Sequence, residues 1–258
     1  MQDMPAEDLL VHPSPAREAP AEAAPAGDAG AESAFLRRTM VDCQIRTFDV
    51  TDRTVLARLL DVPRERFLPA ELRPFAYSDI GLQIPSREPG QEQRTLLPPL
   101  ILARLIQDAG VGPADRVLDV ASSGGYSAAL FAGLAGSVVA IESDPFLLEQ
   151  MRGALDGFGL QDVRTVLAPL ADGAPEEGPF DVIFINGAVE ANLAGLFKQL
   201  KEGGRLLAIH FLPDDPTERA GKAVRFEKIE GEISSRKLFD GSSPVLAAFR
   251  KTPEFSFF

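Results

Sequence analysis

The fold that the sequence predicts depends most on residues 117–126, VLDVASSGGY. An apolar run reaches the acidic residue Asp119 and then breaks into small residues, as a buried strand does where it turns onto a loop that holds a ligand. Small residues suit such a loop because its backbone approaches the ligand closely and the next helix points its N–H groups at it. Two positions that usually carry glycine are Ala121 and Ser123 here, so the question is whether the loop still holds a ligand.

Strands and helices alternate on both sides of this loop. Runs of Val, Ile and Leu predict buried strands at 116–120, 137–142, 162–168, 180–186 and 205–211, and helices are predicted at 126–136, 146–159 and 191–200, the last closed by Gly203 and Gly204. Such alternation indicates a parallel sheet covered on both faces. Segments 223–235 and 244–251 predict two closing strands without a long helix between them. We therefore expect an α/β fold with a doubly wound, mostly parallel seven-stranded sheet of the class I methyltransferase type.

The residues before this sheet predict an N-terminal helical subregion. Apolar residues at helical spacing begin at Phe35, and Thr51 or Asp52 is expected to cap a helix that runs to about Leu60. Residues 77–95 are polar and interrupted by Pro and Gly, which predicts a long exposed connection. A helix is then expected at 99–109, with Pro in its first turn and Gly110 after its end.

Residues 1–34 differ in composition from the rest of the chain. They hold ten Ala, five Pro, seven Asp or Glu and one Arg. Such a segment cannot bury enough apolar surface to offset its ordering entropy, so we interpret it as a disordered acidic tail, with a partner-binding arm around Leu9, Leu10 and Val11 as the alternative. The expected organisation is this tail, a helical and substrate-side region at 35–110, and a Rossmann-like methyltransferase domain at 111–258.

Charge and composition exclude several classes of function. The formal net charge is -12 and no stretch gathers Lys and Arg, so neither nucleic acid nor a membrane is an expected partner. A single cysteine, Cys43, and two isolated histidines, His12 and His210, predict neither a disulfide nor a metal site. The start of the chain lacks a secretory pattern and no apolar run is long enough to span a membrane, so the cytoplasm is the expected compartment.

The predicted topology brings two carboxylates to one edge of the sheet. Ligands of open parallel sheets bind outside the carboxyl ends of the strands, beside the first strand. That position holds Asp119 and its loop, while Glu142 ends the second strand and is suited to accept hydrogen bonds from both hydroxyls of a ribose. An acid, a turn of small residues and a second acid in this order predict a nucleoside-binding site.

Longer segments resemble a known family. MVDCQIRTFDVTDRTVLARLLDVPRERFLP, LPPLILARLIQDAGVGPADRVLDVASSGGYSAAL, VVAIESDP, GPFDVIFINGAV and FDGSSPVLAAFRKTPEFSF are similar to the protein-L-isoaspartate O-methyltransferase family, in particular its proteobacterial branch, over residues 35–258. The resemblance implies a class I methyltransferase fold, S-adenosyl-L-methionine as cofactor, and methylation of the carboxylate of L-isoaspartyl residues as the usual activity.

The resemblance also implies positions for the site, and this sequence departs from the family at several of them. The family's loop falls on Asp119, Ala121, Ser122, Ser123, Gly124 and Gly125, its ribose-binding acid on Glu142, and its adenine-side Gly-Asp pair on Ala168 and Pro169. Asp172, three residues later, could replace that acid only in a rearranged loop. The family's Thr-Ile-Ser-x-Pro segment, whose serine lies at the methyl acceptor, corresponds to Thr95, Leu96, Leu97, Pro98 and Pro99, so Leu97 is expected to make the acceptor site apolar.

Three hypotheses for function follow. The first is an S-adenosylmethionine-dependent methyltransferase acting on a carboxylate or another acceptor, in a protein or a small molecule. The second is a methyltransferase fold that has lost cofactor binding and isoaspartyl activity and acts by binding, as three altered positions around one pocket suggest. The third, a nicotinamide-dependent oxidoreductase, needs glycines at Ala121, Ser123 and Tyr126, and the sequence has none of them.

Overall fold

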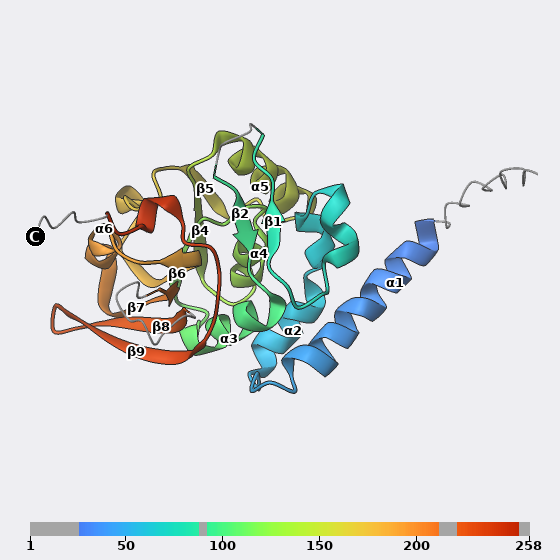
Figure 1. The fold of residues 1–258 in the computed structure, drawn as a ribbon, viewed down its shortest axis with the longest axis horizontal. Coiled ribbons are helices and arrows are strands. Elements are labelled where there is room, and N and C mark those ends of the chain that lie inside the picture. Colours follow the sequence, from blue (N-terminus) through green and yellow to red (C-terminus); the bar gives the residue numbers. More distant parts are fainter. Residues whose placement is uncertain (1–25, 88–91, 212–220, 253–258) are drawn as a thin grey trace, which may run out of the picture.

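A seven-stranded sheet forms the centre of the computed structural model, which describes residues 26–87, 92–211 and 221–252. The strands run in the spatial order β5-β4-β3-β6-β7-β8-β9 (Figure 1). Their bounds are β3 Arg116–Val120, β4 Ser137–Glu142, β5 Arg164–Leu167, β6 Phe180–Val189, β7 Leu200–His210, β8 Lys222–Ile229 and β9 Glu232–Asp240. The seven-stranded sheet predicted from the sequence is confirmed.

The directions of the strands locate the edge of the sheet at which a ligand is expected, the one formed by the carboxyl ends of the parallel strands. β3 pairs in parallel with β4 on one side and with β6 on the other, and β5 and β7 continue the parallel part outward. β8 and β9 are antiparallel additions beside β7. The chain therefore moves outward from β3 through β4 and β5, then returns to the other side of β3, so the strand order reverses at the carboxyl end of β3.

Helices cover the faces of the sheet, and those of the N-terminal part of the chain lie beside it. They are α1 (Ala26–Thr39), α2 (Arg53–Asp61), α3 (Pro99–Ala109), α4 (Tyr126–Ala132), α5 (Pro145–Gly157) and α6 (Ala194–Lys198), with a π-helix η1 (Met40–Ile45) and 3₁₀ turns η2 (Arg64–Phe67), η3 (Ala70–Phe75), η4 (Pro175–Glu177) and η5 (Ala247–Phe249). Two predicted helix ends are confirmed. The Asp52 side chain accepts from Thr54 N and Val55 N at the start of α2, and Gly110 follows α3 with φ 57°.

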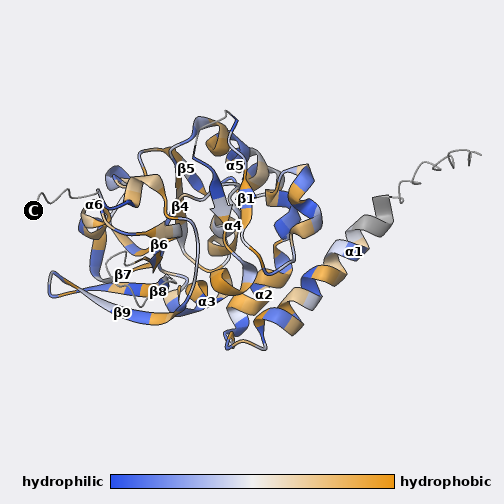
Figure 2. Cartoon of the chain, viewed as in Figure 1, coloured by the Kyte–Doolittle hydropathy of each residue, from blue (hydrophilic) through white to orange (hydrophobic). Residues whose placement is uncertain are grey.

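Alternate residues of the central strands enter two separate cores. Val117 and Val182 pack on the face covered by α3, α4 and α5, while Leu118 and Ile183 pack on the opposite face. Both sets are fully buried, which explains why these strands read as continuous apolar runs. Figure 2 shows the same concentration of hydrophobic residues in the interior and a mixed composition along α1 and β9.

The N-terminal half differs from the expectation in two places. α1 begins at Ala26, so residues 26–34 of the predicted disordered tail are helical, and residues 1–25 lie outside the described part of the chain. The predicted exposed connection at 77–95 contains two short strands, β1 (Leu82–Ile84) and β2 (Arg94–Leu96), paired antiparallel. Leu82 and Ile84 are buried on one face of β1, and Gln83 between them is exposed, as the two-residue period of a strand requires. The segment is mostly polar, so this short alternation did not stand out in the sequence.

Two predicted helices are shorter in the structure. α4 ends at Ala132 rather than at Gly136, and the chain turns at Gly133 to enter β4. The helix expected at 191–200 is only Ala194–Lys198, because β7 already begins at Leu200, which pairs with Phe180. Gly203 and Gly204 therefore lie within β7, where the pairing with β6 shifts register, and do not close a helix.

The closing strands are also placed differently. Segment 223–235, predicted as one strand, contains the turn of a hairpin: Glu230 and Gly231 have φ 53° and 81°, as a two-residue turn between β8 and β9 requires. Segment 244–251 makes only an isolated bridge from Val245 to Ala188 and the turn η5. The hairpin thus follows β7 directly in the sheet.

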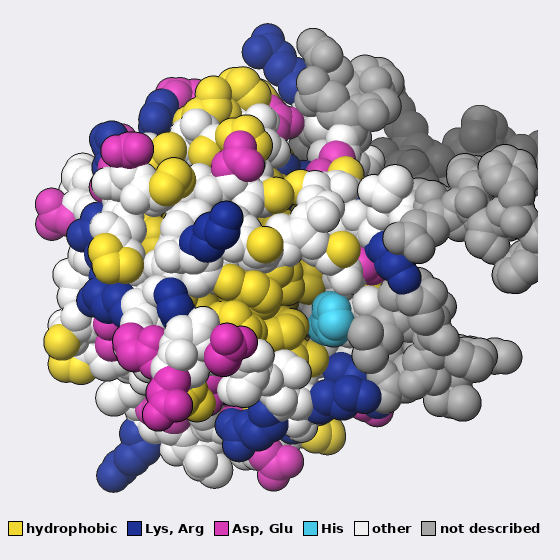
Figure 3. Space-filling view, turned by 90° about the vertical axis from the view of Figure 1, so that its left-hand side faces the viewer, with side chains coloured by type: hydrophobic (Ala, Val, Ile, Leu, Met, Phe, Trp, Pro, Cys, Tyr) yellow, Lys and Arg dark blue, Asp and Glu magenta, His cyan; other side chains and the backbone are white. Residues whose placement is uncertain are grey.

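The surface of the described residues gives two further observations. None of their helices is long and apolar enough to cross a membrane. On the face shown in Figure 3, hydrophobic side chains gather in a central patch with charged side chains around them.

Candidate functional site

A buried carboxylate organises the end of β3. Asp119 is fully buried and accepts hydrogen bonds from Ser122 Oγ at 2.5 Å, Ser127 Oγ at 2.7 Å and Asn186 Nδ2 at 2.7 Å. Burial raises its pKa to about 6, against the opposing effect of these three donors. Asp119 thus ties the loop after β3 to the first turn of α4 and to β6.

The two altered loop positions have a backbone conformation that favours glycine. Ala121 and Ser123 have φ 57° and 56°, in the left-handed region, and Gly125 has φ 89°. A non-glycine residue there costs about 1–2 kcal/mol. The loop therefore holds positive φ at Ala121 and Ser123 at the cost of backbone strain.

The backbone of Phe67 leaves room only for glycine at position 124. A Cβ atom at this position would lie 2.3 Å from the carbonyl oxygen of Phe67, which belongs to η2. The N-terminal helical subregion therefore packs directly on the ligand loop, and only glycine permits this approach.

Glu142, at the end of β4, is held by backbone N–H groups and by an arginine. Its Oε1 accepts from Ser123 N at 2.8 Å, and its Oε2 accepts from Ser143 N at 3.1 Å. The guanidinium of Arg94 reaches both oxygens, with Nε 3.3 Å from Oε1 and Nη2 3.2 Å from Oε2. Burial raises the pKa of Glu142, while Arg94 acts in the opposite direction.

Asn186 connects this network to a cavity. The cavity has a volume of about 270 Å³ and its wall includes Asn186 and Thr95. Because the Asn186 amide nitrogen donates to Asp119, its oxygen points elsewhere, and Oδ1 is a buried acceptor with no hydrogen-bond partner. Ser123 Oγ is buried without a partner as well. Of these two buried atoms, Asn186 Oδ1 belongs to a residue that lines the cavity, so it is the unused acceptor nearest to a ligand there.

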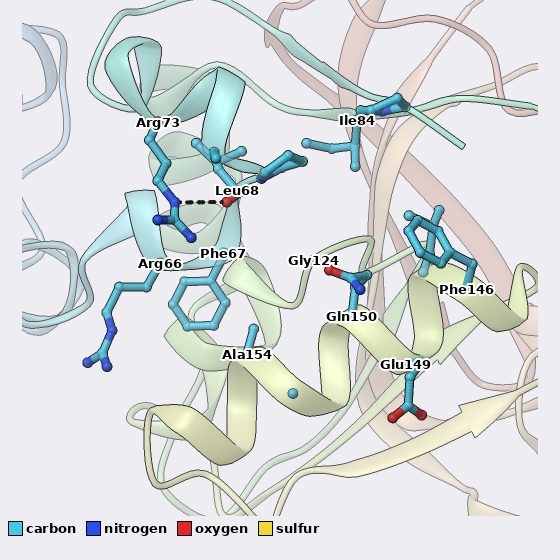
Figure 4. A pocket seen from close by; sticks show the side chains of 15 residues that line it. Arg66, Phe67, Leu68, Arg73, Ile84, Gly124, Phe146, Glu149, Gln150 and Ala154 are labelled. Atoms are coloured by element: carbon cyan, nitrogen blue, oxygen red, sulfur yellow. Dashed lines mark hydrogen bonds between the residues drawn. The ribbon is translucent and has the colours of Figure 1, made fainter. Parts of the chain in front are cut away.

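A larger cavity of about 600 Å³ lies on the other side of Gly124 (Figure 4). η2 and the residues after it form one wall, with Arg66 and Arg73, and α5 forms the other, with Gln150 and Glu149. Neither Asp119 nor Glu142 lines it. The smaller cavity is linked to the carboxylate network through Asn186, which lines it and donates to Asp119.

The structure brings most of the predicted site residues together. Asp119, Ser122, Ser123 and Glu142 are joined by the hydrogen bonds given above, and Ala121 and Gly125 lie in the same loop. Pro169 is exposed, and its neighbour Ala168 donates its N–H to the carbonyl of Glu142. Asp172 is exposed too, on the turn that follows.

The three substrate-side residues separate from one another. Thr95 lines the smaller cavity, and Pro98 caps α3. Leu97 is wholly buried in the hydrophobic core and does not line that cavity. Its apolar side chain therefore does not contribute to the cavity wall, which is mostly polar: Gln83, Glu92, Gln93, Thr95, Asn186, Ser243 and Arg250.

Three residues of the site, Arg94, Ser127 and Asn186, are not predicted from the sequence. A signal existed for the last two, because Ser127 follows the loop in the first turn of the helix and Asn186 ends an apolar run that was predicted as a strand. The sequence gives no signal for Arg94, because it stands in a polar segment whose composition predicts an exposed connection. Among the described residues, no group of three or more His, Cys, Asp or Glu could hold a metal ion.

The fold and the site define a class of protein. Class I methyltransferases have a parallel sheet that ends in an antiparallel hairpin. The first strand of that sheet ends in an acid and a tight loop of small residues, and the second strand ends in another acid. This protein has each of these features. A model of the protein-L-isoaspartate(D-aspartate) O-methyltransferase family matches residues 37–240, and the chain belongs to this family.

Relatives and solved structures agree with this assignment. A protein-L-isoaspartate O-methyltransferase of Koribacter versatilis (strain Ellin345) is 37% identical over 171 residues, 66% of this chain and 74% of that protein. Protein-L-isoaspartate O-methyltransferase 2 of Marinobacter nauticus (strain ATCC 700491 / DSM 11845 / VT8) is 36% identical over 217 residues, 79% and 96% of the two chains.

Two solved structures share the fold. A protein-L-isoaspartate O-methyltransferase has a TM-score of 0.69 at 25% identity, covering 83% of this chain and 66% of that one. A putative enzyme of the same name from Plasmodium falciparum, in complex with S-adenosyl-L-homocysteine, has a TM-score of 0.66 at 17% identity, covering 84% and 98%. None of these matches favours the hypothesis of a fold that has lost its cofactor.

Proposed function

We propose that this protein transfers the methyl group of S-adenosylmethionine to a carboxylate, with L-isoaspartyl residues of proteins as the acceptor class. One observation carries the proposal: Asp119, its loop, Glu142 and Asn186 meet at the carboxyl edge of the sheet, next to a polar cavity. Membership of the family and the names of the relatives support the donor and the acceptor.

The residues present fit the cofactor on one condition. Asn186 Oδ1 and Ser123 Oγ are buried polar atoms without partners, and a bound ligand would satisfy them. Glu142 would hold the ribose hydroxyls, and Ala168 and Pro169, which follow β5, would flank the adenine. The condition concerns Glu142, whose oxygens are bonded to Arg94 and must be released.

The protein's own groups have a positioning role in this chemistry. When bound, S-adenosylmethionine supplies a methyl carbon activated by a sulfonium. Asp119 fixes the loop and directs Asn186, whose free Oδ1 suits a cationic amino group. A carboxylate acceptor is already ionised at neutral pH, so the reaction needs alignment and no general base.

The walls of the smaller cavity suit a carboxylate in a peptide. Thr95 and Ser243 offer hydroxyl donors and Arg250 offers a cation at the edge. The apolar site inferred from Leu97 would have disfavoured such an acceptor, but Leu97 is in the core. Protein substrates, the cytoplasm as compartment and the absence of a nucleic-acid partner remain part of this proposal, as does a partner for the N-terminal tail.

The test has two stages. Titration calorimetry of the protein with S-adenosylhomocysteine should give a saturable one-to-one isotherm, and no heat up to millimolar ligand would reject the cofactor. A peptide with one L-isoaspartyl residue should then accept a labelled methyl group as a base-labile ester, whereas the same peptide with normal aspartate should not. Binding without methylation of the isoaspartyl peptide would retain the donor and reject the acceptor.

A further inference from the structure

Arg94 occupies the position at which the proposed site needs a ligand. It is 2% exposed and Glu142 is 0% exposed. Arg94 Nε donates to both oxygens of Glu142, at 3.3 Å and 3.2 Å, and Nη2 lies 3.2 Å from Oε2. Arg94 Nη2 also donates to Ser143 Oγ at 2.9 Å, so the guanidinium covers the end of β4. Arg94 lies on β2, outside the methyltransferase sheet.

The hydrogen-bonding capacity of Glu142 is used completely. A carboxylate has about four lone-pair positions. Ser123 N and Ser143 N take two of them, and the Arg94 guanidinium takes the others. A ribose diol needs two acceptor positions on the same carboxylate, and only those held by Arg94 belong to a side chain that can move without breaking the loop.

A second partner for Arg94 is already in place. Glu92 Oε2 lies 2.8 Å from Arg94 Nη1, and the Glu92 side chain is 31% exposed. Glu92 also accepts from the backbone N–H of Ala247. An arginine that left Glu142 would therefore keep an anionic partner at the edge of the site, with water available for its remaining donors.

We propose that Arg94 is an internal substitute for the cofactor ribose and sets the affinity of the site: the Arg94–Glu142 ion pair must open before the nucleoside binds. This rests on the proposed function and adds a competing side chain to it. A site that is open only a fraction f of the time binds with an apparent Kd larger by 1/f. Arg94 thus weakens binding of the cofactor and its product, and stabilises the free protein.

The decisive variant is Arg94→Gln, with S-adenosylhomocysteine as the probe and titration calorimetry as the measurement. We expect the Kd to fall by about tenfold or more relative to the unmodified protein, which corresponds to about 1.4 kcal/mol per decade. General damage to the fold weakens binding, so a gain in affinity is specific. In thermal unfolding, the free variant should melt at a lower temperature. At the same ligand concentration it should gain more stability than the unmodified protein, because stabilisation by a ligand grows as its Kd falls.

Two further variants serve as controls. Arg164→Gln removes an arginine from an exposed ion pair at the start of β5 and should leave the Kd unchanged. Arg94→Gln combined with Glu142→Gln removes the ribose acceptor as well, and the gain should disappear. If Arg94→Gln does not fold, Arg94→Lys retains a cation without the planar guanidinium that contacts Glu142, Ser143 and Glu92 together, and should bind S-adenosylhomocysteine severalfold more tightly.

The outcomes are distinguishable. Equal or weaker binding by a folded Arg94 variant, with binding by the unmodified protein, overturns the role of Arg94 and leaves the proposed function intact. No binding by either protein overturns both. A gain that survives in the double variant also overturns the role, because Glu142 would not be the group released.

Discussion

Asp119 shows how one residue sets a pH dependence. Its carboxyl is fully buried with a pKa of about 6, above the ordinary 3.8, because burial outweighs three hydrogen bonds. The folded protein then holds a proton that the unfolded chain has released between these two pH values. The contribution to stability is therefore complete below about pH 3.8 and is lost as the pH rises through 6.

We predict that Asp119→Asn removes this dependence. The unfolding free energy of the unmodified protein, minus that of the variant, should increase by roughly 2 kcal/mol when the pH falls from about 7 to about 4. Urea unfolding at several pH values measures it. A difference that does not change with pH would contradict the raised pKa.

The strained loop gives a second prediction at this scale. Ser123→Gly relieves a positive φ and removes a buried hydroxyl without a partner, so the unfolding free energy should increase by about 1 kcal/mol. Ser137→Gly, at an exposed strand position outside the left-handed region, should lower it by about 0.5–1 kcal/mol. Chemical denaturation compares the two, and a loss at Ser123 would mean that the strain there is negligible.

At the scale of elements, the contact between η2 and the ligand loop holds the helical subregion on the sheet. The carbonyl of Phe67 leaves no room for a side chain on Gly124. The Phe67 ring packs on Tyr126 and Phe158, with centroids 5.8 Å and 5.9 Å away, so η2 is anchored to α4 and to the end of α5.

We predict that Gly124→Ala separates these elements. The added methyl should lower the unfolding free energy by about 1–3 kcal/mol, the usual cost of overpacking, and weaken binding of S-adenosylhomocysteine by moving the loop. Gly153→Ala is the matched control, because a Cβ atom on this α5 glycine would meet no other atom within 4 Å, and alanine there should stabilise by about 1 kcal/mol. Equal effects of the two substitutions would argue against the close contact.

At the scale of the whole molecule, Arg205 joins three parts of the chain. From β7 its Nη2 donates to Gly110 O at 2.7 Å, after α3, and to Asp115 Oδ2 at 2.7 Å, before β3. Its Nε donates to Ala109 O. The end of α3, from which the chain continues to β3, is thereby fixed to the amino edge of the sheet.

We predict that Arg205→Met lowers the unfolding free energy by about 2–4 kcal/mol, because three acceptors lose a charged donor. Arg46→Met, which removes an exposed pair with Asp42, should change it by less than about 1 kcal/mol. Thermal unfolding of both variants measures the contrast. A small effect at Arg205 would show that apolar packing alone holds α3 on the sheet.

The layers of this protein and the place of its ligand loop follow from the sequence alone. Buried parallel strands require continuous apolar runs, helices mark their ends with Asp52 and Gly110, and the acid and small residues after β3 are local in the chain. Local patterns of this kind depend only on residues close together in the chain, so they can be predicted from the sequence.

The partners of Asp119 and Glu142 depend instead on tertiary contacts. Arg94 is 48 residues from Glu142, and Asn186 is 67 residues from Asp119. At such separations, no periodic pattern in the sequence indicates that the residues of either pair will meet. The hairpin of β8 and β9 and the early start of β7 have the same origin, because pairing with neighbouring strands outweighs the local preference for helix or turn. A buried charge requires a partner, and only the folded chain determines which residue supplies it.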